Sequence, residues 1–87
     1  MKDIKFLFAL LEIMNETNVS PVDLEFIEIR NRIAKLCFLS EKGVSIDLVT
    51  VSEVISDLHL ALELLDGDID SELQKFKKKF QELEKAK

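Results

Sequence analysis

Apolar residues between Val51 and Leu65 recur at the three- and four-residue spacing of a single helix face. The helix that they predict spans 51–65, with Thr50 before it and Asp66-Gly67 after it. Its apolar face covers an arc of about 120° and comprises Val51, Val54, Ile55, Leu58, Ala61, Leu62 and Leu65. An arc of this width is typical of a core helix, so we expect this helix at the centre of the fold. Leu60 and Leu64 lie on the opposite side, which indicates that this side also has a partner.

A second helix is predicted over 3–16, with Asp3 as its N-cap and Asn15, Thr17 and Asn18 marking its end. Its apolar residues cover an arc of about 220° and are Ile4, Phe6, Leu7, Phe8, Leu10, Leu11, Ile13 and Met14. Such a wide apolar arc has to be covered on two sides.

A third helix is predicted over 21–42. Ser20 suits an N-cap, Pro21 is tolerated at the first helical position, and Gly43 suits the position after the helix. Its main core face is Val22, Phe26, Ile29, Ile33, Leu36 and Cys37. A second, sparser stripe comprises Leu24, Ile27, Ala34 and Phe38, so this helix also presents two apolar faces.

Segment 44–49 alternates apolar and polar residues, which suits either a short extended segment or, with Ser45 as N-cap, an earlier start of the 51–65 helix. The run Thr50-Val51-Ser52-Glu53 has the form of a capping box and favours a start at Val51. The sequence alone leaves these alternatives open.

The last helix is predicted over 69–86, after a turn at Gly67. Its apolar residues Ile69, Leu73, Phe76, Phe80 and Leu83 form a narrow seam, typical of a helix covered on one side. The four helices and their short connections predict one domain over 1–87, an all-α four-helix bundle of antiparallel neighbours.

The charge of the chain is uneven along its length. Its 87 residues carry a net charge of −5, but residues 1–68 hold six Lys or Arg and thirteen Asp or Glu, whereas residues 69–87 hold six and four. An acidic body repels phosphates, so nucleic acid and anionic membranes are disfavoured partners outside the 69–87 segment.

No apolar run is long enough to span a bilayer, and the short run Phe6–Leu11 lacks the features of a signal peptide. With Cys37 as the single cysteine, these features predict a soluble, cytoplasmic protein.

Two sets of residues are candidates for a metal or catalytic site. Asp66, Asp68 and Asp70 resemble the first ligands of an EF-hand loop, but Ser71 and Lys77 stand where that loop needs glycine and glutamate. His59 has Glu63 and Asp66 on its own helix, yet the chain offers no second histidine or cysteine for zinc and no evident nucleophile. We expect His59 to border the core and bond Glu63, and we expect no catalytic residue, metal or cofactor.

A nucleic-acid alternative rests on two features. Lys75, Lys77, Lys78 and Lys79 surround two phenylalanines, as in surfaces that stack bases. Read as strand, helix, glycine turn and helix, residues 44–86 also resemble in order the ribbon-helix-helix DNA-binding family. That resemblance would place the outward strand residues, including Ser45 and Asp47, in a major groove.

The prediction favoured by the sequence is a non-enzymatic protein–protein interaction module, such as an adaptor, chaperone or regulatory subunit. The second apolar stripes hold more surface than the narrow seam of the last helix would cover, which indicates a homodimer formed mainly through the first two helices. The predicted interface residues are Phe6, Leu10, Ile13, Leu24, Ile27, Phe38, Leu60 and Leu64. A contact with another protein remains open beside the homodimer.

Overall fold

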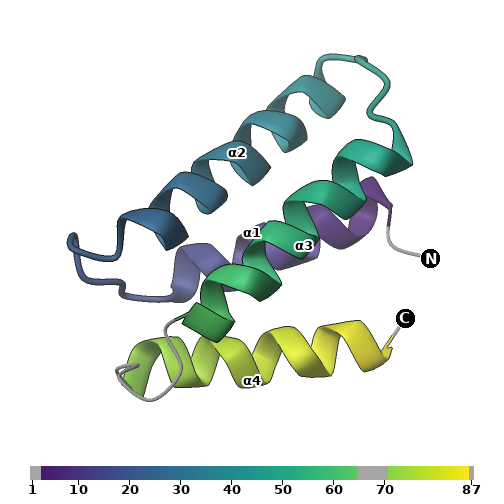
Figure 1. The fold of residues 1–87 in the computed structure, drawn as a ribbon. Coiled ribbons are helices and arrows are strands. Elements are labelled where there is room, and N and C mark those ends of the chain that lie inside the picture. The colour runs from purple at the N-terminus through teal and green to yellow at the C-terminus, as the bar shows by residue number, and fades with distance from the viewer. Residues whose placement is uncertain (1–2, 65–70, 87) are drawn as a thin grey trace.

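Four α-helices form the fold in the computed structural model, which describes residues 3–64 and 71–86 (Figure 1). They are α1 (Ile4–Glu16), α2 (Leu24–Glu41), α3 (Leu48–Leu64) and α4 (Ser71–Ala86). No strand occurs within these two ranges. The predicted all-α, four-helix fold is confirmed.

The central helix of the fold is α1. It packs against α2, α3 and α4, whereas α2 and α3 lie beside one another and run in opposite directions (Figure 1). The expectation that the 51–65 helix would be central was therefore wrong. The physical reason lies in the sequence of α1, since its wide apolar arc allows contacts on more than one side.

The core collects the main apolar face of every helix. Its buried residues are Leu7, Leu10, Met14, Phe26, Ile29, Ile33, Cys37, Val51, Val54, Ile55, Leu58, Ala61, Leu62, Leu73, Phe76 and Phe80. The predicted core stripe of α3 is confirmed from Val51 to Leu62, and Leu65 lies outside the described residues. No buried side chain among the described residues is polar or charged, so packing alone specifies this interior.

The N-terminus of α1 is capped as predicted. One carboxylate oxygen of Asp3, Oδ1, accepts from the backbone N–H groups of Lys5 and Phe6 at 3.0 and 3.3 Å. The helix ends at Glu16, and Thr17 follows it with an extended backbone.

The start of α2 differs from the prediction by three residues. Ser20 and Pro21 belong to a turn in which the Ser20 carbonyl accepts from the Asp23 N–H at 3.0 Å, and the helix begins only at Leu24. Serine and proline favour turns as well as helix starts, so this signal was ambiguous. As a consequence, Val22 leaves the predicted core face and is 81% exposed.

The end of α2 follows the prediction. Gly43 has a φ of 91°, a conformation that residues with a Cβ rarely adopt. The N–H groups of Val44 and Gly43 donate to the carbonyls of Leu39 and Ser40, both at 3.0 Å, and this pair of bonds is a Schellman motif.

Segment 44–49 is not a strand. Residues 44–47 have no regular structure, while Leu48 and Val49 already belong to α3. The Asp47 carboxylate accepts from the Thr50 N–H at 2.7 Å and caps the helix, so the predicted capping box at Thr50 and the alternative cap at Ser45 were both wrong. The alternation of apolar residues in this segment does not reflect a strand. Ile46 packs against the core from a loop, while Val44 and Leu48 are exposed.

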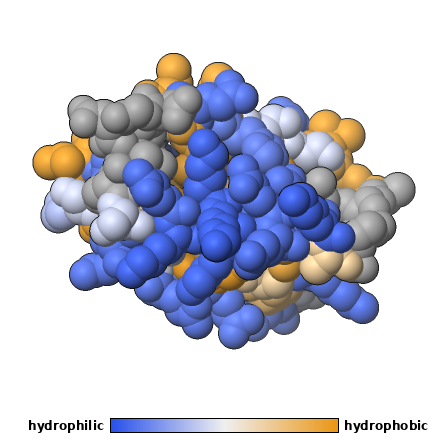
Figure 2. Space-filling model, turned by 90° about the horizontal axis from the view of Figure 1, so that it is seen from below, coloured by the Kyte–Doolittle hydropathy of each residue, from blue (hydrophilic) through white to orange (hydrophobic). Residues whose placement is uncertain are grey.

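The seam of α4 is confirmed where the structure describes it. Leu73, Phe76 and Phe80 are buried and Leu83 is partly buried, whereas Ile69 lies outside the described residues. Seen from the α4 side, the surface is mostly hydrophilic, with hydrophobic residues at its margins (Figure 2). In the described part of the chain, no helix is both long and apolar enough to cross a membrane.

Candidate interaction surface

A groove between the first half of α2 and the second half of α3 is the main candidate site, and we call it the α2/α3 groove. It encloses about 310 Å³ and is lined by Glu25, Glu28, Ile29, Arg32, Asp57, Leu60, Ala61 and Leu64. Ile29 and Ala61 are buried at its floor, whereas Leu60 and Leu64 on α3 are 56% and 68% exposed. The groove therefore offers apolar side chains that the fold leaves uncovered.

The apolar surface continues past the start of α2. A neighbouring hollow is lined by Val22, Asp23, Leu24, Glu25, Phe26 and Leu64, so Glu25 and Leu64 belong to both depressions. Val22 and Leu24 are among the most exposed apolar residues of the described chain. Exposed apolar groups from two helices thus form one patch, which is the usual mark of an interaction site.

The rim of the α2/α3 groove is acidic. Arg32 Nη1 lies 2.7 Å from Asp57 Oδ2, and this ion pair joins the two helices at one end. Glu25 and Glu28 are exposed, and neither takes part in an ion pair among the described residues. With Arg32 neutralised by Asp57, the groove keeps a net negative charge.

The three interface residues predicted on α1 are largely covered within the chain. Leu10 is fully buried, while Phe6 and Ile13 are partly buried and pack against the core. The Phe6 and Phe80 rings lie 6.4 Å apart, so α4 covers this side of α1. Leu10 is therefore not available as an interface residue, and Phe6 and Ile13 offer less surface than the sequence indicated, because they pack against the core of their own chain.

The other predicted interface residues separate into two groups. Leu24, Leu60 and Leu64 come together around the α2/α3 groove, and Ile27 on α2 is partly buried. Phe38 is exposed, but it lies roughly 20 Å further along α2 and has the Lys42 ammonium 5.3 Å from its ring centre. Sequence reasoning missed Val22, whose exposure follows from the turn at Pro21.

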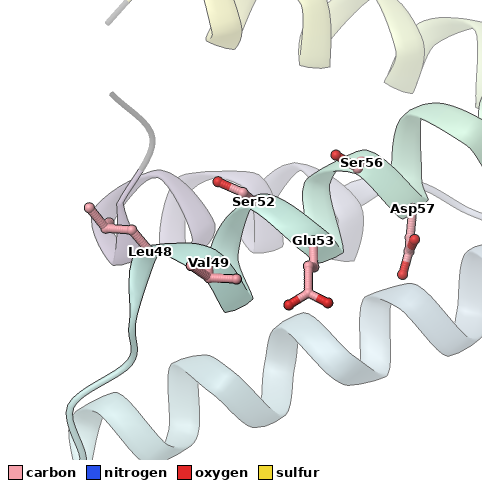
Figure 3. A pocket seen from close by; sticks show the side chains of 6 residues that line it. All are labelled: Leu48, Val49, Ser52, Glu53, Ser56 and Asp57. Atoms are coloured by element: carbon pink, nitrogen blue, oxygen red, sulfur yellow. The ribbon is translucent and has the colours of Figure 1, made fainter.

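A second depression lies on α3 alone, lined by Leu48, Val49, Ser52, Glu53, Ser56 and Asp57 (Figure 3). Glu53 and Asp57 point towards α2, whereas Ser52 and Ser56 point to the other side of the helix (Figure 3). Two serine hydroxyls without a neighbouring base do not make a nucleophile. This depression therefore offers no evident chemistry.

His59 forms a contact different from the predicted one. Its Nε2 lies 3.0 Å from Glu84 Oε2 on α4, and its ring lies 4.9 Å from the Phe80 ring. The expected bond to Glu63 was wrong, because the neighbouring helix places a carboxylate closer than the next turn of α3 does. His59 thus helps to join α3 to α4.

Cys37 is buried in the core on α2. Burial, and after it the negative charge of Glu41, raises the pKa of its thiol. A protonated, buried thiol is a poor nucleophile, so Cys37 acts as a small apolar core residue.

The lysines of α4 do not form the base-stacking surface of the nucleic-acid alternative. Lys75 pairs with Glu72 at 3.7 Å and Lys79 with Glu16 at 3.8 Å, while Lys78 is exposed and Lys77 half-buried. Phe76 and Phe80 are buried, so no base can stack on them. The ribbon-helix-helix order also fails, because residues 44–47 are not a strand and Asp47 caps α3.

Within the described ranges, no three His, Cys, Asp or Glu side chains gather as a metal site would require. The acidic turn with Asp66, Asp68 and Asp70 lies outside those ranges. The chain matches no protein-family model, no curated protein and no solved structure.

Proposed function

We propose that this protein is a non-enzymatic interaction module, an adaptor, chaperone or regulatory subunit, that binds another polypeptide through the α2/α3 groove. One observation carries the proposal: Leu60 and Leu64 on α3, Leu24 at the start of α2 and Val22 just before it line two adjoining depressions and form one connected, exposed apolar patch. A patch of this kind raises the free energy of the isolated chain in water, and a partner that covers it recovers that free energy. The single buried cysteine suits a reducing compartment, and the proposed location is the cytoplasm.

Self-association is one form that this function can take. In a homodimer, two copies would bury their patches against one another about a twofold axis. We propose the facing sides of α2 and α3 for this contact, in place of α1 and α2, because Leu10 is buried and Phe6 and Ile13 pack against the core of their own chain.

Sedimentation velocity at micromolar concentration tests this form directly. Leu64→Glu adds a charge inside the patch, and Val49→Glu adds the same charge elsewhere on α3 at a residue that is 67% exposed. Self-association through the groove predicts a dimer that Leu64→Glu converts to a monomer and that Val49→Glu leaves intact. A clean wild-type monomer contradicts self-association, and a monomer that also binds no amphipathic helix contradicts the interaction module as a whole.

DNA binding has less support. Of the lysines on α4, Lys75 and Lys79 lie near acidic side chains of the same chain, and the rings of Phe76 and Phe80 are buried. A salt-sensitive shift of a duplex probe, weakened by Lys77→Glu and Lys78→Glu, would revive that alternative.

A further inference from the structure

We propose that the occupant of the α2/α3 groove is an amphipathic helix of another protein, with apolar anchors flanked by Lys or Arg, rather than a second copy of this chain. This inference rests on the proposed function and names the partner by its chemistry. It is carried by the combination of an apolar floor, exposed leucines and an acidic rim in one groove.

The dimensions of the groove suit a helix. Its lining residues fall within 57–64 of α3 and 25–32 of α2, and at about 1.5 Å per residue each of these segments is roughly 10 Å long. Two turns of a partner helix would fill that length. Anchors spaced three, four and seven residues apart on that helix would contact Leu60, Leu64 and the floor at Ile29.

The acidic charges of the rim favour basic residues beside the apolar stripe of the partner helix. Glu25 and Glu28 lie on successive turns along the α2 side and have no ion-pair partner among the described residues. Asp57 on the α3 side is already paired with Arg32. A partner with Lys or Arg beside its apolar stripe would place cations near Glu25 and Glu28, whereas acidic flanks would be repelled.

A second copy of the chain fits this rim poorly. A twofold contact would bring the Glu25 and Glu28 carboxylates of both copies to the same interface, and α3 contributes no Lys or Arg to offset them. The lysine-rich helix of a second copy cannot supply the anchors, because Leu73, Phe76 and Phe80 of α4 are buried in its own core. Charge complementarity therefore favours a basic helix from a different protein.

The test uses the full chain and a pair of fluorescein-labelled model helices of about 18 residues, long enough to exceed the groove at both ends. Both peptides carry the same leucine stripe, and they differ only in having Lys or Glu beside it. A scrambled Lys peptide without the stripe controls for general attraction to an acidic protein. Fluorescence anisotropy measures each dissociation constant at low and at moderate salt.

We expect the Lys-flanked helix to bind at least about tenfold more tightly than the Glu-flanked helix and the scrambled peptide, and to weaken as salt increases. Leu64→Glu should weaken binding of the Lys-flanked helix at least about tenfold, whereas Val49→Glu should change it less than about twofold. Removing the rim charges with Glu25→Gln and Glu28→Gln together should weaken it about three- to tenfold. Glu12→Gln and Glu82→Gln remove the same charge from exposed positions on α1 and α4 and should have little effect.

Each contrary outcome has a distinct meaning. Equal binding of the two flanked helices, or no effect of the Glu25→Gln and Glu28→Gln pair, overturns the choice of a basic partner and keeps the groove as an interaction site. If the wild-type protein is a dimer and Leu64→Glu dissociates it, a second copy of the chain occupies the groove. That result overturns this inference and supports the interaction module. Failure of both helices to bind a monomeric protein overturns the inference and the proposed function together. Circular dichroism of every variant confirms that the helices remain folded.

Discussion

The side of the molecule formed by α1 and α4 and the side formed by α2 and α3 differ in what covers their apolar residues. On the first side, the Phe6 and Phe80 rings lie 6.4 Å apart, and the Lys79 ammonium on α4 lies 3.8 Å from the Glu16 carboxylate on α1. On the second side, Leu60 and Leu64 remain exposed beside a groove whose carboxylates face solvent. Both α1 and α3 carry two apolar faces in sequence, but only α1 has a neighbour on each. A doubled apolar face therefore indicates a partner without saying whether that partner belongs to the same chain.

Among the changes that test this difference, removal of the Phe80 ring should have the largest effect on the free energy of unfolding. Phe80 is buried and its ring lies near those of Phe6, Phe76 and His59, so Phe80→Ala should lower the free energy of unfolding by about 3–5 kcal/mol. Leu64→Ala on the other side should change it by less than about 0.5 kcal/mol, because Leu64 has little burial to lose. Urea denaturation monitored by circular dichroism measures both. Similar losses for the two variants would mean that the two sides are equally covered.

The turn between α2 and α3 should be the next most sensitive position. At a φ of 91°, alanine is strained even though no atom lies within 4 Å of the added Cβ, so Gly43→Ala should cost about 1–2 kcal/mol. The cost comes from the backbone, since there is no steric clash to relieve. Thermal unfolding checks this value, and an unchanged midpoint would show that the Schellman motif does not hold the turn.

The N-cap of α3 should matter less and should depend on pH. The backbone N–H of Thr50, then its side chain, lowers the pKa of the Asp47 carboxyl, so the charged form is favoured in the folded state. Its stabilisation is present above the ordinary carboxyl pKa of about 4 and is lost as the pH falls through the lower folded value. Asp47→Ala should therefore lower the unfolding midpoint at pH 7, and this difference from wild type should vanish in strong acid.

Ser45→Ala serves as the control for this cap, because Ser45 is exposed and is the alternative cap that the sequence offered. It should leave the midpoint unchanged at both pH values. A larger loss for Ser45→Ala than for Asp47→Ala would place the start of α3 elsewhere.

The ion pair across the α2/α3 groove should have the smallest effect. Arg32 and Asp57 are each half exposed, so water screens their attraction, and a double-mutant cycle with Arg32→Ala and Asp57→Ala should give a coupling below about 1 kcal/mol. A stronger coupling would mean that this pair, rather than apolar packing, holds α2 against α3. The same cycle measured on binding of the Lys-flanked helix would show whether the pair shapes the end of the groove.

The sequence by itself determined the number of helices, most of their core faces and several of their ends. Asp3 and Gly43 were identified correctly because a cap or a left-handed residue acts within one turn of the chain. The buried stripe of α3 from Val51 to Leu62 was correct because helical periodicity sorts one face from the other. The starts of α2 and α3 were wrong because serine, proline and threonine serve turns and caps equally well, and only the folded backbone chooses between them.

Only the tertiary structure decided which helices have their second apolar face covered by a neighbouring helix. Both α1 and α3 carry apolar residues outside their main core face. On α1, Phe6 packs against the core, whereas on α3, Leu60 and Leu64 are exposed. Periodicity reports the direction in which a side chain points from its own helix, but it carries no information on which helix lies there. The packing of α4 against α1 rather than over the outer face of α3 depends on the whole chain, and it leaves Leu60 and Leu64 at the α2/α3 groove uncovered.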